Sequence, residues 1–158
     1  MFNIHNFYIP AGGDEPDPKV NEKFKHKLDF LNEATVYMKT KEKNSFTALV
    51  GDLNIAPHEN DVWSHKQLLK IVSHTPIEVK KLTKFQNSIN FIDAIREFHP
   101  LSEKLYSWWS YRSRDWEVSD RGRRLDHIWV TPKLNKKLTK ASIQKNIRGW
   151  DKPSDHSP

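Results

Sequence analysis

Four short stretches of the sequence place side chains that could carry out chemistry at the ends of apolar segments. They are residues 6–10 (Asn-Phe-Tyr-Ile-Pro), 51–54 (Gly-Asp-Leu-Asn), 122–127 (Gly-Arg-Arg-Leu-Asp-His) and 153–156 (Pro-Ser-Asp-His). Carboxylates and imidazoles can exchange protons with water or a leaving group. Carboxylate and amide oxygens are also the ligands that Mg²⁺ and Mn²⁺ prefer. Together these groups could support hydrolysis assisted by a divalent cation.

Each stretch also has an ordinary structural explanation when it is considered alone. An Asp-x-Asn sequence after a strand, as at 52–54, is common in turns and helix caps. Arg124 and Asp126 could form an ion pair, and Tyr8 could lie in the core. Residues 154–156 could be a solvated end of the chain. The presence of all four stretches, in this order, is what favours a shared site.

The first part of the chain has the patterns of a strand followed by a helix. Residues 2–9 alternate loosely and predict a strand, and the turn-forming residues 11–18 predict a loop. A helix is predicted over 20–41 because apolar residues recur at helical spacing. The members of this apolar stripe are Phe24, Leu28, Leu31, Thr35 and Met38.

The apolar run 46–50 predicts a buried strand that ends at Gly51. This strand would place Asp52 and Asn54 at its carboxyl end, where ligands bind in open α/β sheets. The order of elements predicts an α/β fold with layers of helix and sheet. Further helices are predicted near 64–73 and 76–88, and further strands at 106–109, 125–130 and 141–148.

The composition favours a folded domain with an uneven charge. The chain has 158 residues, no Cys and a formal net charge of +6. Residues 121–158 hold 10 Lys and Arg against 3 Asp and Glu, whereas residues 1–120 hold 16 against 17. This excess favours a polyanionic partner, and a solvated surface explains it equally well. The lack of Cys excludes disulfides and thiolate-bound zinc.

We expect the chain to form a single, incomplete domain. No apolar stretch is long enough to span a membrane and the start does not resemble a signal peptide, so we expect a cytoplasmic protein without a membrane partner. We also expect a monomer. A sheet made only of the predicted strands would leave an exposed edge. We therefore expect residues 1–158 to form part of a domain.

The motifs, in their order, resemble those of the exodeoxyribonuclease III family, the abasic-site endonuclease branch of the endonuclease/exonuclease/phosphatase superfamily. The matching stretches are 6–10, 51–57, 106–112, 120–127 and 152–156. The resemblance implies a four-layer α/β sandwich, two sheets flanked by helices, of which this chain covers the C-terminal two-thirds. It also implies Mg²⁺-dependent cleavage of DNA at abasic sites and removal of nucleotides or blocking groups from 3′ ends, as in base-excision repair.

The same resemblance implies roles for five residues around the scissile phosphate. Asp52 would position or deprotonate the attacking water, and Asn54 would hold that water or the phosphate. His156 would donate to a phosphoryl oxygen. Asp126 would hydrogen-bond the imidazole and favour its protonated form. Tyr8 would contact the phosphate through its hydroxyl.

The implied cofactor is Mg²⁺ or Mn²⁺, with Asp155, Asp52 and Asn54 as candidate ligands. The family's main metal-binding Glu lies in a Gln-Glu motif upstream of the Asn-x-Tyr-x-Pro strand, and this sequence does not match that motif. We therefore expect weaker metal binding and slower turnover. Ala11 stands where relatives often have a polar residue, which leaves the balance of endonuclease and exonuclease activity open.

The implied partner is double-stranded DNA with abasic sites or 3′ ends. Trp108 and Leu125 match positions that form the wall of the pocket for a flipped-out abasic sugar. Arg112 and Arg123 are candidates for contacts with the DNA backbone or the minor groove.

Several alternatives stay open at the level of the sequence. Trp109 and Tyr111 could support the sugar pocket or pack in the core. A superfamily phosphatase or phosphodiesterase acting on a phosphoinositide, sphingomyelin or RNA would share the acidic motifs, although the aromatic block and the basic C-terminal segment argue against a lipid. A DNA-binding remnant without catalysis would follow from the unmatched Glu.

Overall fold

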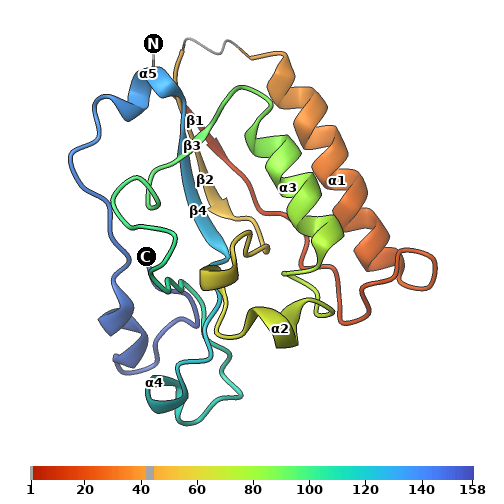
Figure 1. Cartoon of the computed structure of the whole chain (residues 1–158), viewed down its shortest axis with the longest axis vertical. Coiled ribbons are helices and arrows are strands. Elements are labelled where there is room, and N and C mark those ends of the chain that lie inside the picture. The colour runs from red at the N-terminus through yellow and green to blue at the C-terminus, as the bar shows by residue number, and fades with distance from the viewer. Residues whose placement is uncertain (1, 42–44) are drawn as a thin grey trace.

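The computed structural model describes residues 2–41 and 45–158. A mixed sheet with the strand order β1-β2-β4-β3 forms its centre. Helices α1 (Glu22–Lys39) and α3 (Pro76–Gln86) lie side by side on one face of this sheet (Figure 1). This arrangement confirms the predicted α/β class, and the sheet and its helices correspond to two of the layers that the resemblance implies.

The strands bring segments from the whole chain together. β1 (Phe2–Asn6) is parallel to β2 (Phe46–Asp52), whereas β4 (Asp126–Val130) is antiparallel to β2 and to β3 (Ile92–Asp93). The sequence predicted β1, β2 and β4. It did not predict β3, because two residues are too few to show a period.

The two long helices form where the sequence predicts them. The Asn21 side chain accepts hydrogen bonds from the first-turn backbone of α1, and all five members of the predicted apolar stripe are buried. A capping box of Thr75 and Glu78, with Pro76 in the first turn, begins α3. The main core lies between these helices and the sheet, and includes Leu31, Met38, Leu49, Leu82, Phe85 and Trp129.

Three predicted elements differ in the structure. Residues 64–73 contain only the four-residue α2 (His65–Leu68), and residues 141–148 are no strand but lead into the short helix η2 (Lys145–Gly149). Residues 106–109 make only isolated bridges. The short elements not yet named are η1 (Glu59–Asp61), α4 (Trp116–Ser119) and α5 (Pro132–Asn135).

The irregular backbone at 106–109 has a direct cause. The backbone N–H groups of Ser107 and Trp108 both donate to the carbonyl oxygen of Arg123, each at 2.9 Å. Two residues therefore face one, and a regular ladder cannot continue. The stretch Tyr-Ser-Trp-Trp predicted a strand here, but its pairing depends on a segment far away in the sequence.

The sheet exposes apolar side chains on one of its faces. β1 lies at one edge. On the face opposite to α1 and α3, Phe2, Ile4 and Ile128 are 55%, 62% and 44% exposed. Within the described ranges, no helix combines the length and the apolar character that crossing a membrane requires.

Candidate active site

Asp52, Asp126 and His156 meet at one end of the sheet. One possible ligand atom of each residue lies within 4.8 Å of those of the other two. β2 and β4 bring the two carboxylates together, because Asp52 and Asp126 are partners in the antiparallel register. His156 arrives from the C-terminal segment, which pairs with Trp108. The structure thus joins three of the residues predicted to act on one phosphate.

The imidazole of His156 lies between the two carboxylates. Its Nδ1 is 2.8 Å from Oδ2 of Asp126, and its Nε2 is 3.9 Å from Oδ2 of Asp52. The hydrogen bond that His156 donates to Asp126 raises the pKa of His156, and the negative charge of Asp126 adds to this effect against the opposing effect of burial. The site therefore favours an imidazolium whose Nε2 faces Asp52.

Asp52 is held by the residue that follows it by two positions. The backbone N–H of Asn54 donates to Oδ1 of Asp52 at 2.9 Å, and Asn54 Nδ2 donates to Oδ2 at 3.0 Å. Asn54 has a φ of 52°, a left-handed conformation that Asn adopts more readily than most residues. Burial raises the pKa of Asp52, and the nearby charge of Asp126 adds to the increase. A carboxylate with a raised pKa is a stronger base for a water molecule.

Ser107 orients Asp126 and was not predicted. Its Oγ donates to Oδ2 of Asp126 at 2.7 Å and accepts from the backbone N–H groups of Leu125 and Asp126 at 3.0 Å each. Asp126 Oδ2 thus receives hydrogen bonds from both Ser107 and His156. A single Ser within an aromatic block has no spacing that would have revealed this contact.

Tyr8 and Asp155 lie near the cluster but outside the three-residue set. The N–H of Ile9 donates to the carbonyl of Asp52 at 3.0 Å, so the strand pairing continues past β1 and places Tyr8 beside Asp52 with 66% of it exposed. Oδ2 of Asp155 accepts from Nε1 of Trp108 at 3.0 Å. The phosphate contact of Tyr8 and the metal ligation by Asp155 stay predictions.

A groove of about 840 Å³ adjoins the cluster and is called here the aromatic groove. Asn54 and His156 line it on the side of the cluster. Two guanidinium–indole pairs lie in it, with Arg123 Cζ 5.5 Å from the ring centroid of Trp108 and Arg121 Cζ 4.8 Å from that of Trp63. Trp63 and Arg121 were not predicted. All four predicted DNA-binding residues line this groove: Trp108, Leu125, Arg112 and Arg123.

The two other aromatic residues of the block have different environments. Trp109 is 1% exposed and donates from Nε1 to Asp120 at 2.9 Å, so its core-packing alternative is correct. Tyr111 is exposed, and its hydroxyl donates to the carbonyl of Pro153 at 2.8 Å. Tyr111 therefore ties the aromatic block to the segment that ends in His156.

The ion pair considered for Arg124 exists, but with other partners. Arg124 is fully buried and bonds Asp61 through Nε at 2.8 Å and Asp93 through Nη1 at 2.8 Å. Asp126 is therefore not bonded by Arg124 and instead bonds His156 in the site.

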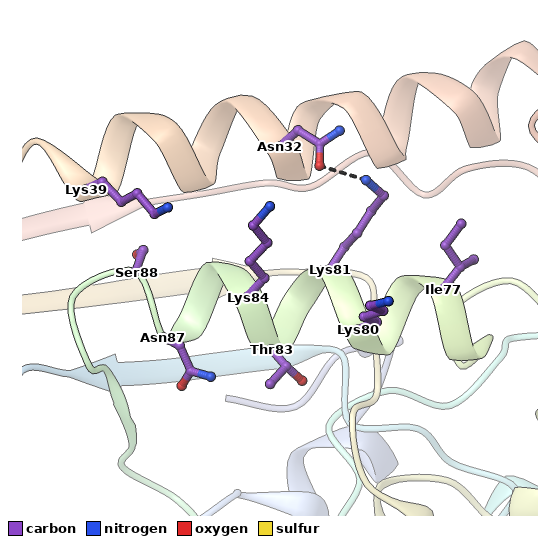
Figure 2. A pocket seen from close by; sticks show the side chains of 9 residues that line it. All are labelled: Asn32, Lys39, Ile77, Lys80, Lys81, Thr83, Lys84, Asn87 and Ser88. Carbon is purple, nitrogen blue, oxygen red and sulfur yellow. Dashed lines mark hydrogen bonds between the residues drawn. The ribbon is translucent and has the colours of Figure 1, made fainter.

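A second hollow of about 730 Å³ lies between α1 and α3 (Figure 2). Lys39, Lys80, Lys81 and Lys84 line it, and Lys81 Nζ donates to Oδ1 of Asn32 at 2.7 Å. None of its lining residues is a carboxylate or an imidazole. This basic surface therefore has no group resembling the cluster of Asp52 and His156.

Residues 27–156 match the model of the endonuclease/exonuclease/phosphatase family. The chain belongs to this family. Exodeoxyribonuclease III from Haemophilus influenzae is 30% identical over 166 residues, which cover 100% of this chain and 60% of the relative. An exodeoxyribonuclease from Bacillus subtilis is 30% identical over 139 residues, which cover 87% of this chain and 52% of the relative.

Solved structures of family members have the same fold. An AP endonuclease from Archaeoglobus fulgidus superposes with a TM-score of 0.90 at 30% identity, over 98% of this chain and 58% of that one. A 3′-5′ exonuclease from Neisseria meningitidis gives 0.87 at 25% identity, with the same coverage. The chain spans less than two-thirds of the length of these relatives. The predicted resemblance to exodeoxyribonuclease III is confirmed.

Proposed function

We propose that this family member contributes the catalytic residues of a DNA repair nuclease that hydrolyses phosphate esters at abasic sites and 3′ ends. The observation that supports this most is the convergence of Asp52, Asp126 and His156 beside the aromatic groove. The names of similar proteins, which include exodeoxyribonuclease III and AP endonuclease, support DNA as the substrate. A cytoplasmic location and a monomeric state are part of the same proposal.

The acid–base roles follow from the positions of the three side chains. Asp52 accepts a proton from the attacking water. Burial raises the pKa of this carboxyl group, which makes it a stronger base. Protonated His156 donates through Nε2 to a phosphoryl oxygen and stabilises the negative charge that grows there. Asp126 holds Nδ1 of the same ring at 2.8 Å, which fixes its orientation and keeps it charged.

The donor set is suited to a hard divalent cation. The carboxylates of Asp52 and Asp126 and the amide of Asn54 provide oxygen atoms, which Mg²⁺ and Mn²⁺ prefer over nitrogen or sulfur. When bound, the cation supplies positive charge that stabilises the phosphoryl oxygens. Asp155 is a further proposed ligand, and Trp108 Nε1 is the group that it bonds in this structure.

Cleavage assays test this function. A duplex with a tetrahydrofuran abasic site and a duplex with a recessed 3′ end are incubated with the chain in Mg²⁺ or in EDTA. We expect cleavage only in Mg²⁺, and a rate about 10²-fold to 10³-fold lower for His156→Gln, since a donor to the developing charge is lost. Asp52→Asn should have a loss of similar size. His26→Gln, an exposed histidine on α1, is the matched control.

Two results would contradict the proposal in different ways. Full activity of both site variants would refute the assigned mechanism. DNA binding without metal and without turnover would favour the alternative of a DNA-binding protein without catalysis. The Arg and Trp side chains of the aromatic groove are the observation that supports this alternative. Preference for a phosphoinositide or RNA in the same assay would replace DNA as the substrate.

A further inference from the structure

Arg123 is fixed in the aromatic groove by contacts on two sides. Its Nη1 donates to the carbonyl of Val72 at 3.2 Å and to Oγ of Ser73 at 2.8 Å. Its guanidinium carbon lies 5.5 Å from the ring centroid of Trp108. Nη1 is therefore anchored to the protein, and the guanidinium carbon lies over an indole ring.

The charge of Arg123 has no carboxylate partner. Burial lowers its pKa, and among residues 2–41 and 45–158 no Asp or Glu forms an ion pair with it. Glu78 attracts it electrostatically but is bonded to Lys27 at 2.6 Å. The next residue, Arg124, is bonded by two carboxylates. A half-buried guanidinium without an anion is costly, so this position is suited to receive one.

The anion would lie in the same groove as the catalytic cluster. The backbone of Trp108 bridges Arg123 on one side and His156 on the other, and all three residues line the aromatic groove. The second guanidinium–indole pair, Arg121 on Trp63, lies in this groove too. Positive charges alternating with flat rings match a strand in which phosphates alternate with bases.

We propose that Arg123 binds a second phosphate of the substrate strand, next to the phosphate that is hydrolysed. This inference rests on the proposed nuclease function and deepens it. The groove would select a strand with an adjacent charged phosphate over an isolated phosphate ester. The pocket expected for an abasic sugar between Trp108 and Leu125 is then apolar on one side and charged on the side of Arg123. A guanidinium binds a phosphate more favourably than it binds a sugar ring without its base.

A neutral-linkage scan tests the pairing of Arg123 with one phosphate. Duplexes carrying a single methylphosphonate at successive positions around the 3′ end are titrated with wild-type chain and with Arg123→Met. For the wild type, one neutral linkage beside the scissile position should weaken binding about tenfold, the scale of a charge-assisted hydrogen bond. Arg123→Met should bind unmodified DNA about tenfold more weakly than the wild type does. In this variant, the neutral linkage beside the scissile position should weaken binding no further.

Two further variants separate the contact from a general charge effect. Arg114→Met removes an exposed guanidinium that does not line the groove, and should weaken all duplexes alike. Arg123→Lys keeps the charge and should retain part of the linkage effect. Circular dichroism establishes that each variant is folded. Equal linkage effects in the wild type and in Arg123→Met, or coupling at the scissile position only, would overturn the proposal.

A titration with inorganic phosphate identifies the source of the bound phosphate, and the cleavage assay separates this proposal from the nuclease function. The side-chain Nε–H signal of Arg123 in an ¹⁵N-labelled chain should shift if free phosphate occupies the same place, and stay fixed if only a strand phosphate does so. Either result, together with the linkage effect, supports the proposal and identifies the source of the phosphate. A linkage effect without any DNA cleavage would refute the nuclease function alone.

Discussion

Replacing Glu78 by Gln should expose how strongly a buried ion pair holds the active-site loops. Neither Glu78 nor Lys27 has exposed side-chain surface, and Nζ of Lys27 lies 2.6 Å from Oε1 of Glu78. Nζ also donates to the carbonyls of Asn54 at 2.8 Å and Ala11 at 3.1 Å. These two carbonyls belong to the loops after β2 and β1, so Lys27 joins the segments on both sides of Asp52.

The magnitude follows from the charge that Glu78→Gln leaves behind. Removing one partner of a buried ion pair costs about 3–5 kcal/mol, because the other charge stays buried without compensation. A domain of this size has a free energy of unfolding of about 5–15 kcal/mol. The variant should therefore lose about a fifth or more of its free energy of unfolding.

The loss should depend on pH in a defined direction. Burial already lowers the pKa of Lys27, with Glu78 opposing that shift, and Glu78→Gln removes the opposition. Between the folded and the unfolded pKa of Lys27, the unfolded chain binds more protons, so stability rises with pH. Glu78→Gln should be less destabilised at about pH 9.5 than at about pH 7.

Urea unfolding followed by Trp fluorescence measures both effects. The control is Asp29→Asn, which breaks the exposed ion pair with Lys25 at 2.7 Å and should leave the unfolding midpoint unchanged. The double variant Lys27→Met/Glu78→Gln should recover part of the stability, because no uncompensated charge remains. If Glu78→Gln behaved like Asp29→Asn and its midpoint were independent of pH, the structural role given to the Lys27–Glu78 pair would be refuted.

Two further predictions concern the sheet. Gly51→Ala should lower the free energy of unfolding by more than about 4 kcal/mol, because φ of Gly51 is +130° and a Cβ would lie 2.0 Å from the carbonyl oxygen of Phe7. Thermal unfolding measures this loss. The control is Gly149→Ala, where the atom nearest to the added Cβ is 3.6 Å away. Burial alone would raise the pKa of Asp93, but the charge of Arg124 holds this pKa below its ordinary value. The ion pair should therefore stabilise the fold above about pH 4, and this stabilisation should be lost in more acidic solution. Between pH 6 and pH 3, the free energy of unfolding measured in urea should fall less steeply for Asp93→Asn than for the wild type. An equal slope in both proteins would contradict the stabilising role given to the Asp93–Arg124 pair.

Elements with a complete local pattern could be predicted from the sequence. The apolar stripe of α1 is buried along its whole length, and Asn21 caps the helix where the stripe begins. The run before Gly51 forms β2 with Asp52 at its end. Each of these features depends on neighbours within a few residues, so the sequence contains the information directly.

Elements whose partners are distant could not be predicted in the same way. Residues 106–109 were predicted to form a strand, yet the N–H groups of Ser107 and Trp108 share the carbonyl of Arg123 and the ladder stops. Residues 141–148 also lack the predicted pairing. Ser107 orients Asp126 only because these segments are packed together, and no local spacing indicates such a contact.

The sequence by itself determined which groups the site contains: Asp52, Asn54, Asp126 and His156, in an order typical of their family. Only the tertiary structure decided how near these groups lie, that burial raises the pKa of Asp52, and that Arg123 lines the aromatic groove without an ion pair to any Asp or Glu of residues 2–41 and 45–158. The physical reason is that desolvation and Coulomb energy depend on distances in space, which packing between remote segments sets.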